Sequence, residues 1–497
     1  MWTALAPAVD GTYMAVVHAN CPCNELAALC LRQFRPVPHQ VFGAPSLPIL
    51  RVFRALRRHA RRYDGAVWTR EEVVGSYAGA MRRKYEEAAR SLRFRGLSEA
   101  DYRLDAFLKA EKPRSPSKVG KPRMIYPRSP RYNLELARYL KPLEHWLWGT
   151  LTLKRLFGTG PTSRVVAKGL NPRQRANLIA RKLRSFEECV CFEVDGSAFE
   201  AHLGPVQLQL EHLVYLSAYE MDAKLRRLLA VQLELRGRTS SGIEFWRPGG
   251  RASGDVNTGM GNTLVMLAVV AGVLRHLRVD FDLLVDGDNA LVFLPGAVAP
   301  SVCENFARLV KEACGHEMKL CKPVTVMEEI RFGGSAPINL GPGGWTMVRD
   351  WERVLGSSLA SHVHLREPKF AVEWMAGVAQ CELSLALGVP VLQEYFLQVL
   401  RRIGPLKRPV RTHPLRDYFL IGAHMARIEE ARPVLDITRI SFERAFGVPV
   451  DLQRQYEALF AGVTLPTSQT DYYKQPLEDA ADVLDWVQSV VLPESTF

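Results

Sequence analysis

Residues 281–295, FDLLVDGDNALVFLP, place a carboxylate and an amide between two apolar, strand-like runs. Asp-Gly between such runs favours a β-hairpin, because glycine tolerates the positive φ that tight hairpin turns require. The turn would present Asp288 at its tip, followed directly by Asn289. Chemistry on phosphates ordinarily uses two carboxylates, so a partner for Asp288 is expected elsewhere in the chain.

The segment CFEVDGSAFEAHL, residues 191–203, supplies a candidate for that partner. Asp195 would lie at the C-terminal end of an apolar strand, and Glu200 comes five residues later. A strand that ends in aspartate is common, so the segment alone says little about function. On neighbouring strands, Asp195 and Asp288 could hold two Mg²⁺ ions that clamp the attacking and leaving oxygens of an in-line phosphoryl displacement.

Hydroxyl and amide side chains gather in SGDVNTGMGN, residues 253–262. Ser253 precedes a flexible glycine, and Thr258 and Asn262 are four residues apart, so they share one face of the predicted helix. Such groups suit hydrogen bonding to a sugar hydroxyl or a base edge. The alternative is a helix N-terminus capped by Ser253 or Asn257, which leaves Asn262 unexplained.

The segment FLKAEKPRSPSKVGKPRMIYPRSPRYN, residues 107–133, is basic and rich in proline. Prolines fix extended backbone, so the cations between them can line a channel for a triphosphate. The candidates are Lys109, Lys112, Lys121 and Arg123. A solvated basic loop is the alternative interpretation of this segment taken alone.

The elements that must position these segments follow from the spacing of apolar residues. This spacing predicts helices over residues 51–62, 71–92, 205–235, 264–274 and 389–404. A helix in 173–191 leads into the strand before Asp195, a glycine-rich loop spans 237–254, and helices dominate from about residue 366 to an acidic tail. The helix at 51–62 carries six arginines opposite its apolar side, a face that suits solvent, RNA or anionic lipid.

The composition favours a folded chain with a polyanionic partner. Lys and Arg number 65 against 52 Asp and Glu, a net charge of +13 that suits nucleic acid or an anionic membrane surface. Nine cysteines at irregular spacing argue for free thiols in a reducing compartment, and His18, Cys21, Cys23 and Cys30 match no common zinc pattern. We expect no signal peptide. The apolar run at 264–274 is too short to span a bilayer and indicates a buried helix, so any membrane contact would be peripheral.

The order of the segments is more specific than any one of them. A basic segment, an Asp-ending strand, a Ser-Gly…Thr…Asn helix and a Gly-Asp hairpin follow one another as motifs F, A, B and C do in viral RNA-directed RNA polymerases. The chain resembles that family from about residue 85 to about residue 365, most closely the tombusvirus-like group of positive-strand RNA viruses. The segments with that group's character are FLKAEKP, PRSPRYNLELARYLKPLE, RASGDVNTGMGN and GGWTMVRD.

The resemblance implies a role for each matched residue. Asp195 would ligate both metal ions, Mg²⁺ or Mn²⁺, and Asp288 the catalytic one, with Asn289 where the family has a second Asp. Glu200, where the family usually has Asp, would sense the ribose 2′-hydroxyl together with Ser253 and Asn262. The matched substrate-binding residues are Lys109, Lys112, Lys121, Arg123, Glu200, Ser253, Thr258 and Asn262.

Two further segments extend the resemblance. HEMKLCKP, residues 316–323, resembles motif D, whose lysine protonates the pyrophosphate leaving group, and Lys319 is the first choice for that lysine with Lys322 second. IRFGGSAPI, residues 330–338, resembles motif E at the junction of palm and thumb, with Gly333 in place of the family's Cys.

By the same resemblance the fold is α+β, a closed right hand of fingers, palm and thumb. The palm would be an antiparallel sheet flanked by helices, and the thumb would be helical. The expected divisions are an N-terminal extension with fingertips over 1–95, fingers over 96–188, palm over 189–345 with a fingers insertion at about 205–250, and thumb with acidic tail over 346–497.

The function so predicted is an RNA-directed RNA polymerase that replicates a viral RNA genome by template-directed two-metal nucleotidyl transfer. One alternative is a polymerase-like RNA-binding protein whose catalysis is impaired or absent because of Asn289, although polymerases of nonsegmented negative-strand viruses also carry Gly-Asp-Asn. A less favoured one is a reverse transcriptase. The expected partners are RNA template and product, nucleoside triphosphates, an auxiliary viral replication protein and host factors, at membrane-associated sites in the host cytoplasm.

Overall fold

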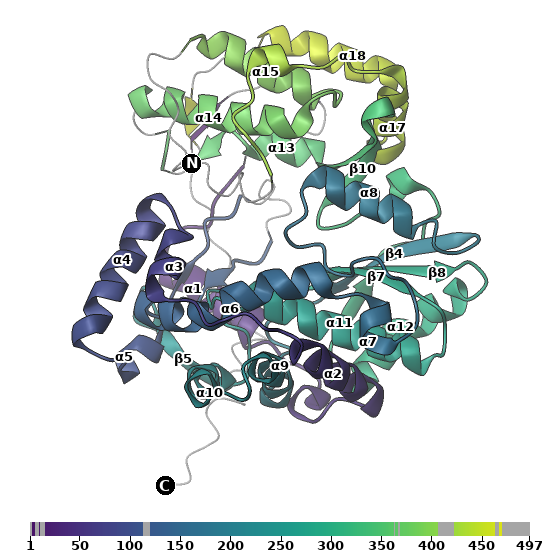
Figure 1. The fold of residues 1–497 in the computed structure, drawn as a ribbon. Coiled ribbons are helices and arrows are strands. Elements are labelled where there is room, and N and C mark those ends of the chain that lie inside the picture. Colours follow the sequence, from purple (N-terminus) through teal and green to yellow (C-terminus); the bar gives the residue numbers. More distant parts are fainter. Residues whose placement is uncertain are drawn as a thin grey trace.

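The structure is a computed structural model that describes residues 2–4, 9, 15–112, 120–361, 363–365, 368–405, 422–462 and 467–469. The chain combines runs of helices with largely antiparallel sheets, so the α+β class predicted from the sequence is confirmed. Figure 1 shows helices α13 to α18 gathered on one side of the molecule, with strands β4, β7 and β8 and their helices on the other. The acidic tail and residues 113–119 of the basic segment lie outside the described residues.

A four-stranded antiparallel sheet in the order β7-β8-β4-β9 carries both predicted carboxylates. Its strands are β4 (Cys189–Gly196), β7 (Asp282–Asp286), β8 (Asn289–Pro295) and β9 (Met318–Leu320). Strands β7 and β8 form the predicted hairpin, and Gly287 in its turn has a φ of 65°, the left-handed conformation that favours glycine. The register pairs Asp195 with Asn289 on one side and with Lys319 on the other.

Helices α11 (Thr258–His276) and α12 (Ala299–Cys314) pack against this sheet. Among the described residues, α11 is the one helix long and apolar enough to cross a membrane, yet 78% of that stretch is buried inside the fold. The prediction of a buried helix is confirmed. The apolar run at 264–274 is only part of this helix, which continues beyond the run at both ends to 19 residues.

Helix α2 (Leu47–Ala60) confirms the predicted basic helix and begins four residues earlier than expected. Its apolar side, which includes Val52, Phe53 and Leu56, is at most 1% exposed and packs against α11 and against α9 (Pro205–Ala218). The arginine-bearing side faces outward. Only the apolar face of α2 therefore packs in the core, and its arginine face is exposed.

A second sheet, in the order β3-β2-β5-β6, joins two distant parts of the chain. Its strands are β2 (Leu104–Leu108), β3 (Met124–Ile125), β5 (Glu234–Thr239) and β6 (Glu244–Pro248). The prediction of a loop over 237–254 was wrong for its first half, which forms the β5–β6 hairpin. Glycine is required at position 237 because a Cβ there would lie 2.3 Å from the carbonyl oxygen of Leu104 on the neighbouring strand.

Two of the predicted helices are broken in the structure. Residues 71–92 form α3 (Arg70–Gly75) and α4 (Gly79–Phe94), and Gly79, directly after the break, adopts a φ of 56°. Residues 205–235 form α9 and α10 (Ala223–Ala230), separated by Glu220 and Met221 at positive φ. The Asp222 carboxylate then starts α10 by accepting a hydrogen bond from the Leu225 amide at 2.7 Å.

The remaining helices before the central sheet are α1 (Pro22–Ala28), α5 (Glu99–Tyr102), α6 (Pro130–Thr150), α7 (Leu153–Phe157) and α8 (Pro172–Lys182). Helix α8 confirms the predicted helix that leads into β4. It also packs on the β10–β11 hairpin that follows the central sheet, and thus connects the two sides of the molecule. This hairpin consists of β10 (Ser335–Asn339) and β11 (Trp345–Arg349).

The C-terminal part has its own apolar core, with Phe396 and Phe442 fully buried. Its helices are α13 (Trp351–Ser357), α14 (Pro368–Ala386), α15 (Leu392–Ile403), α17 (Asp436–Phe446) and α18 (Val450–Leu459). Three short strands, β1 (Trp2–Ala4), β12 (Ala360–Ser361) and β13 (Thr467–Gln469), pair beside them. The predicted helical character after residue 366 is confirmed in the described residues.

Candidate active site

Asp195 and Asp288 open into one cavity of about 630 Å³ at the end of the central sheet. Strand pairing places Asp195 between Asn289 and Lys319, so these three side chains emerge on one face of the sheet. The Gly196 amide donates a hydrogen bond to the Asp288 carbonyl oxygen at 3.1 Å, which fixes the turn against the end of β4. The charged and amide side chains that line the cavity are Arg32, Arg35, Lys121, Arg123, Asp195, Asp288, Asn289, Glu317 and Lys319.

Both carboxylates are held where their charged forms are disfavoured. Burial raises the pKa of Asp195, and the negative charge of Asp288 raises it further. Burial likewise raises the pKa of Asp288, with a contribution from Glu200. A cation beside the pair would relieve both the desolvation and the mutual repulsion.

The donors at this point fit a hard divalent ion. Within the described part of the chain no group of three or more His, Cys, Asp or Glu forms a metal cluster. The site therefore offers two carboxylates and the Asn289 carbonyl oxygen, a set that leaves positions for water and phosphate oxygens. Mg²⁺ is commonly bound in this way, through one or two carboxylates and the phosphates of its substrate.

The cavity also holds five cations against three carboxylates, an excess that suits a triphosphate. Burial lowers the pKa of Lys121, and the positive charges of Arg35, Arg32 and Lys319 lower it further. Four cations thus lie within electrostatic reach of one another beside the carboxylates.

Two of these cations, Arg32 and Arg35, were not predicted from the sequence. They come from the turn of π-helix at Leu29–Gln33 and the residues just after it. Arg32 Nε lies 2.7 Å from Glu200 Oε1, and Arg35 Nη2 lies 3.0 Å from Glu317 Oε2. The sequence signal is two arginines three apart in LCLRQFRP, which is too ordinary to identify a site.

Of the predicted cations of the basic segment, Lys121 and Arg123 line this cavity, and Lys109 and Lys112 do not. Lys109 and Arg123 both form ion pairs with Glu111, at 2.7 Å and 3.3 Å. Lys112 Nζ donates a hydrogen bond to the Ser357 carbonyl oxygen at 2.8 Å, and burial lowers the pKa of Lys112 to about 8.

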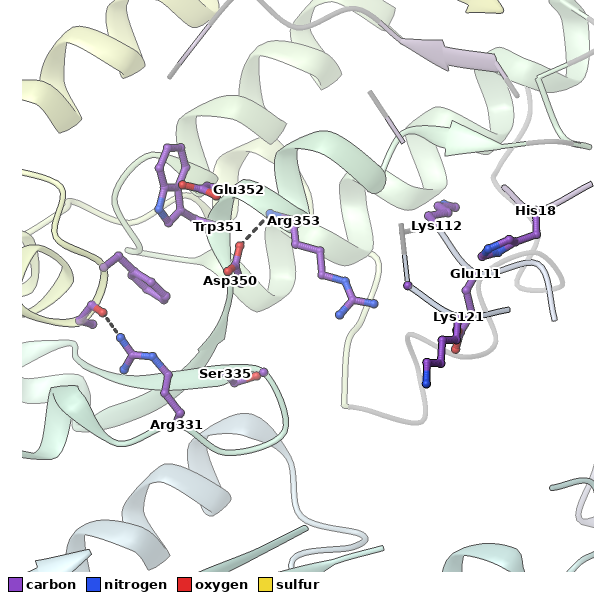
Figure 2. Close-up of a pocket in the computed structure, with 14 residues that line it drawn as sticks. His18, Glu111, Lys112, Lys121, Arg331, Ser335, Asp350, Trp351, Glu352 and Arg353 are labelled. Atoms are coloured by element: carbon purple, nitrogen blue, oxygen red, sulfur yellow. Dashed lines mark hydrogen bonds between the residues drawn. The ribbon is translucent and has the colours of Figure 1, made fainter. Parts of the chain in front are cut away.

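A second cavity, of about 770 Å³, separates the basic segment from the C-terminal part. Figure 2 shows His18, Glu111, Lys112 and Lys121 on one side of it, facing Arg353 across the space. Lys121 lines both cavities, so the two spaces meet at this side chain.

None of the predicted ribose-sensing residues, Glu200, Ser253 and Asn262, lines this cavity, although Glu200 pairs with Arg32, which does. Asn262 Oδ1 accepts a hydrogen bond from Arg251 Nε at 2.9 Å, and Arg251 is itself in a buried ion pair with Glu211. The hydroxyl of Thr258 donates within its own turn, to the carbonyl oxygens of Ala252 and Asp255.

Backbone contacts fix the turn that holds Ser253. The Ser253 carbonyl oxygen accepts a hydrogen bond from the Tyr126 amide at 3.2 Å. A Cβ at Gly254 would lie 2.6 Å from the Tyr126 carbonyl oxygen, so only glycine fits against the basic segment here. The alternative that Asn257 caps α11 through its side chain was wrong. Asn257 does occupy the cap position, but its amide donates to Glu211 and Gln232 in the core.

Thr263, which was not predicted, ties α11 to the hairpin. Its hydroxyl oxygen accepts a hydrogen bond from the Gly287 amide at 3.0 Å, and Thr263 is 1% exposed. Directly before this turn, Asp286 forms ion pairs with Lys168 at 2.9 Å and Arg175 at 2.7 Å. Although burial opposes them, these two cations lower the pKa of Asp286. The charge of Asp286 is therefore already compensated outside the cavity.

Comparison with known proteins identifies the family of this chain. The family model described as viral RNA dependent RNA polymerase matches residues 5–468. Similar proteins, each named RNA-directed RNA polymerase, come from Tobacco necrosis virus (strain A), Carnation mottle virus and Turnip crinkle virus, with identities of 30%, 32% and 30%. These alignments cover 91%, 84% and 90% of this chain, and 62%, 53% and 57% of the relatives. The chain thus spans only part of the length of the curated relatives it matches, but it belongs to the viral RNA dependent RNA polymerase family.

Proposed function

We propose that this chain is an RNA-directed RNA polymerase that extends RNA by template-directed nucleotidyl transfer during replication of a viral genome. The observation that carries the proposal is the meeting of Asp195 and Asp288 in one cavity with an excess of cations. Carboxylates suit metal ions and the cations suit a triphosphate, and nucleotidyl transfer needs both in the same place.

In this proposal Asp195, Asp288 and the Asn289 carbonyl oxygen hold two ions, Mg²⁺ or Mn²⁺, which when bound stabilise charge on the attacking and leaving oxygens. Lys121, Arg123, Arg32 and Arg35 bind the triphosphate of the incoming nucleotide. The 3′-hydroxyl of the growing strand loses its proton to solvent, its oxygen forms a bond to the α-phosphorus, and the bond from that phosphorus to the pyrophosphate oxygen breaks.

Lys319 donates a proton to the departing pyrophosphate. The geometry that supports this role is its position directly opposite Asp195 on the neighbouring strand, with its side chain lining the cavity. Lys322, the second choice, is not among the residues that line the cavity. Lys319 is therefore the better candidate for the acid.

Recognition of the ribose 2′-hydroxyl is proposed for Glu200, Ser253 and Asn262. Glu200 is close enough to Asp288 to influence its pKa. Asn262 is held in place by Arg251, and it immediately precedes Thr263, which contacts the hairpin turn. These contacts support a sugar-binding role for Glu200 and Asn262, and the role of Ser253 rests on the resemblance alone.

The proposed architecture is a right hand, with fingers over 96–188, palm over 189–345 and thumb over 346–497 beside the N-terminal extension. Two contacts support a closed form. Lys112 of the basic segment reaches Ser357 of α13, and strand β5 of the proposed fingers insertion pairs with β2 of the fingers. The auxiliary proteins and the membrane-associated location remain predictions from the resemblance.

The test is an extension assay on a purified chain with a defined RNA template, comparing ribonucleotides with deoxyribonucleotides in Mg²⁺ and in Mn²⁺. We expect template-dependent incorporation that prefers ribonucleotides. RNA binding without incorporation in either metal would instead identify a non-catalytic polymerase-like protein, and preferential use of deoxyribonucleotides would identify a reverse transcriptase.

A further inference from the structure

A hollow of about 480 Å³ on the outer side of α2 is lined by positive charges and by no negative one. Four of its arginines, Arg51, Arg54, Arg58 and Arg61, are exposed and recur along one face of the helix and its end. We call it the arginine hollow. Its lining residues are Arg51, Arg54, Ala55, Arg57, Arg58, Arg61, Leu156, Phe157 and Arg275.

Three elements build the arginine hollow, and none of its lining residues is acidic. Helix α2 and its C-terminal end supply five arginines, α7 supplies Leu156 and Phe157, and the last turn of α11 supplies Arg275. The guanidinium of Arg275 lies over the ring of Phe157, 4.2 Å from its centroid. Six guanidinium groups without a carboxylate repel one another, and a bound polyanion would remove that repulsion.

The arginine hollow shares no lining residue with the cavity of Asp195 and Asp288. In Figure 1, α2 lies at the end of the molecule opposite to the C-terminal helices α13 to α18. The hollow therefore does not belong to the candidate active site.

We propose that the arginine hollow is a second RNA-binding surface, which holds the phosphate backbone of a strand outside the active-site cavity. Arginine binds phosphate oxygens through two parallel hydrogen bonds, and six such groups around a concave surface can follow a strand without reading its sequence. The proposal rests on RNA being a partner of this chain, as in the proposed function, but not on catalysis.

The burial of α2 distinguishes RNA from a membrane as the occupant. A basic amphipathic helix binds a bilayer by inserting its apolar face among the lipids. Here that face is committed to the core, with Val52, Phe53 and Leu56 at most 1% exposed. Only the charged side of α2 is available, and its shape is concave, which fits a strand of phosphates better than a flat lipid surface.

The experiment removes the four exposed arginines as Arg51→Gln, Arg54→Gln, Arg58→Gln and Arg61→Gln. Glutamine keeps helix propensity, and Arg57, which donates to the Ser217 hydroxyl, is left in place. The matched control loses the same charge from four exposed cations on α4 and α10, as Arg83→Gln, Lys84→Gln, Arg90→Gln and Arg226→Gln. The probe is a labelled single-stranded RNA, titrated over a range of salt concentrations without nucleotides or divalent ions.

We expect the α2 variant to bind this RNA about tenfold more weakly than the unmodified chain, with a salt dependence shallower by roughly 0.7 for each phosphate that the arginines no longer neutralise. The control variant should keep the salt dependence of the unmodified chain. Equal decreases in affinity for the two variants would overturn the proposal, because the effect would then be one of net charge alone. Should the fourfold variant fail to fold, Arg54→Gln with Arg58→Gln carries the same test with about half the change in slope.

Two further measurements distinguish this proposal from membrane binding and from the proposed catalytic function. Binding to phosphatidylcholine vesicles with and without phosphatidylserine should not depend on the four arginines. If the α2 variant loses vesicle binding but keeps RNA binding, the surface is a membrane contact and the proposal fails. Extension of a short template at saturating RNA should be the same in the α2 variant as in the unmodified chain. If the unmodified chain binds RNA at the arginine hollow but never extends it, that result contradicts the proposed function and leaves this proposal standing.

Discussion

The active-site cavity and the arginine hollow are both rich in cations, but only one of them contains carboxylates. Five cations in the cavity stand beside Asp195, Asp288 and Glu317. Six arginines in the hollow stand beside apolar side chains alone. Their positions in the fold differ as well, since the cavity lies where a sheet ends and the hollow lies on an exposed helix face.

The presence or absence of carboxylates beside the cations distinguishes a site suited to chemistry on phosphates from one suited only to binding them. A polyanion is held by positive charge alone, and its affinity is spread over many contacts. Transfer of a phosphoryl group also needs groups that are repelled by phosphate, because these hold the metal ions that stabilise charge in the transition state. The half-buried carboxylates of Asp195 and Asp288 are unfavourable together in their charged forms, which supports the proposal that they bind cations.

The largest effect should come from removing either carboxylate of the cavity. We expect Asp195→Ala and Asp288→Ala each to lower nucleotide incorporation by at least about 10³-fold, since each deletes charge that holds a metal ion. RNA affinity should change by no more than about twofold, because it depends on dispersed cations. The two quantities are read from single-nucleotide extension and from filter binding on the same preparations, and substantial incorporation by either variant would contradict the assignment.

A smaller loss is expected for the proposed proton donor. Lys319→Leu should slow the chemical step by roughly 10²-fold with little change in KM, because a positioned acid acts in the transition state. Lys322→Leu is the matched control, as it removes an exposed lysine three residues away and should leave turnover intact. Pre-steady-state extension measures the step, and a loss confined to Lys322→Leu would move the role to that residue.

The hairpin turn offers a test of positioning without any change in charge. Thr263→Val keeps the side-chain shape but leaves the Gly287 amide without its acceptor, which should lower kcat by roughly tenfold with KM unchanged. Thr263→Ser restores the acceptor and should restore kcat. Steady-state kinetics measure kcat and KM of the unmodified chain, Thr263→Val and Thr263→Ser, and thermal unfolding measures their stability. A loss of thermal stability with no loss of kcat would make Thr263 a purely structural residue.

The sequence identified residues whose neighbours carry a local pattern. Asp195 and Asp288 follow apolar strand patterns, and their order with the basic segment and α11 was enough to place them in one site. Arg32 was missed because its partner Glu200 is 168 residues away and nothing local marks either side chain as paired. The break at Glu220 and Met221 was missed for a related reason, since positive φ at such residues is imposed by packing and not by their own preference.

The smallest effect concerns the amide that stands where the family has a second carboxylate. Asn289 pairs with Asp195 across the sheet and lines the cavity, so its carbonyl oxygen can reach an ion held there. Asp286 cannot supply the missing charge, because Lys168 and Arg175 already compensate it outside the cavity. With one negative charge fewer, the site should hold Mg²⁺ weakly and favour Mn²⁺, which lies higher in affinity for oxygen and nitrogen donors and tolerates imperfect geometry.

We therefore expect the unmodified chain to be a few-fold more active in Mn²⁺ than in Mg²⁺, and Asn289→Asp to shift the preference towards Mg²⁺. Titration of each metal in the extension assay measures the shift, and Asn289→Ala serves as the control that removes the oxygen altogether. If Asn289→Asp instead turns a wholly inactive chain into a polymerase in both metals, the amide has abolished catalysis. The chain would then be an RNA-binding member of its family that has kept the cations of the cavity and lost the charge that made them useful for chemistry.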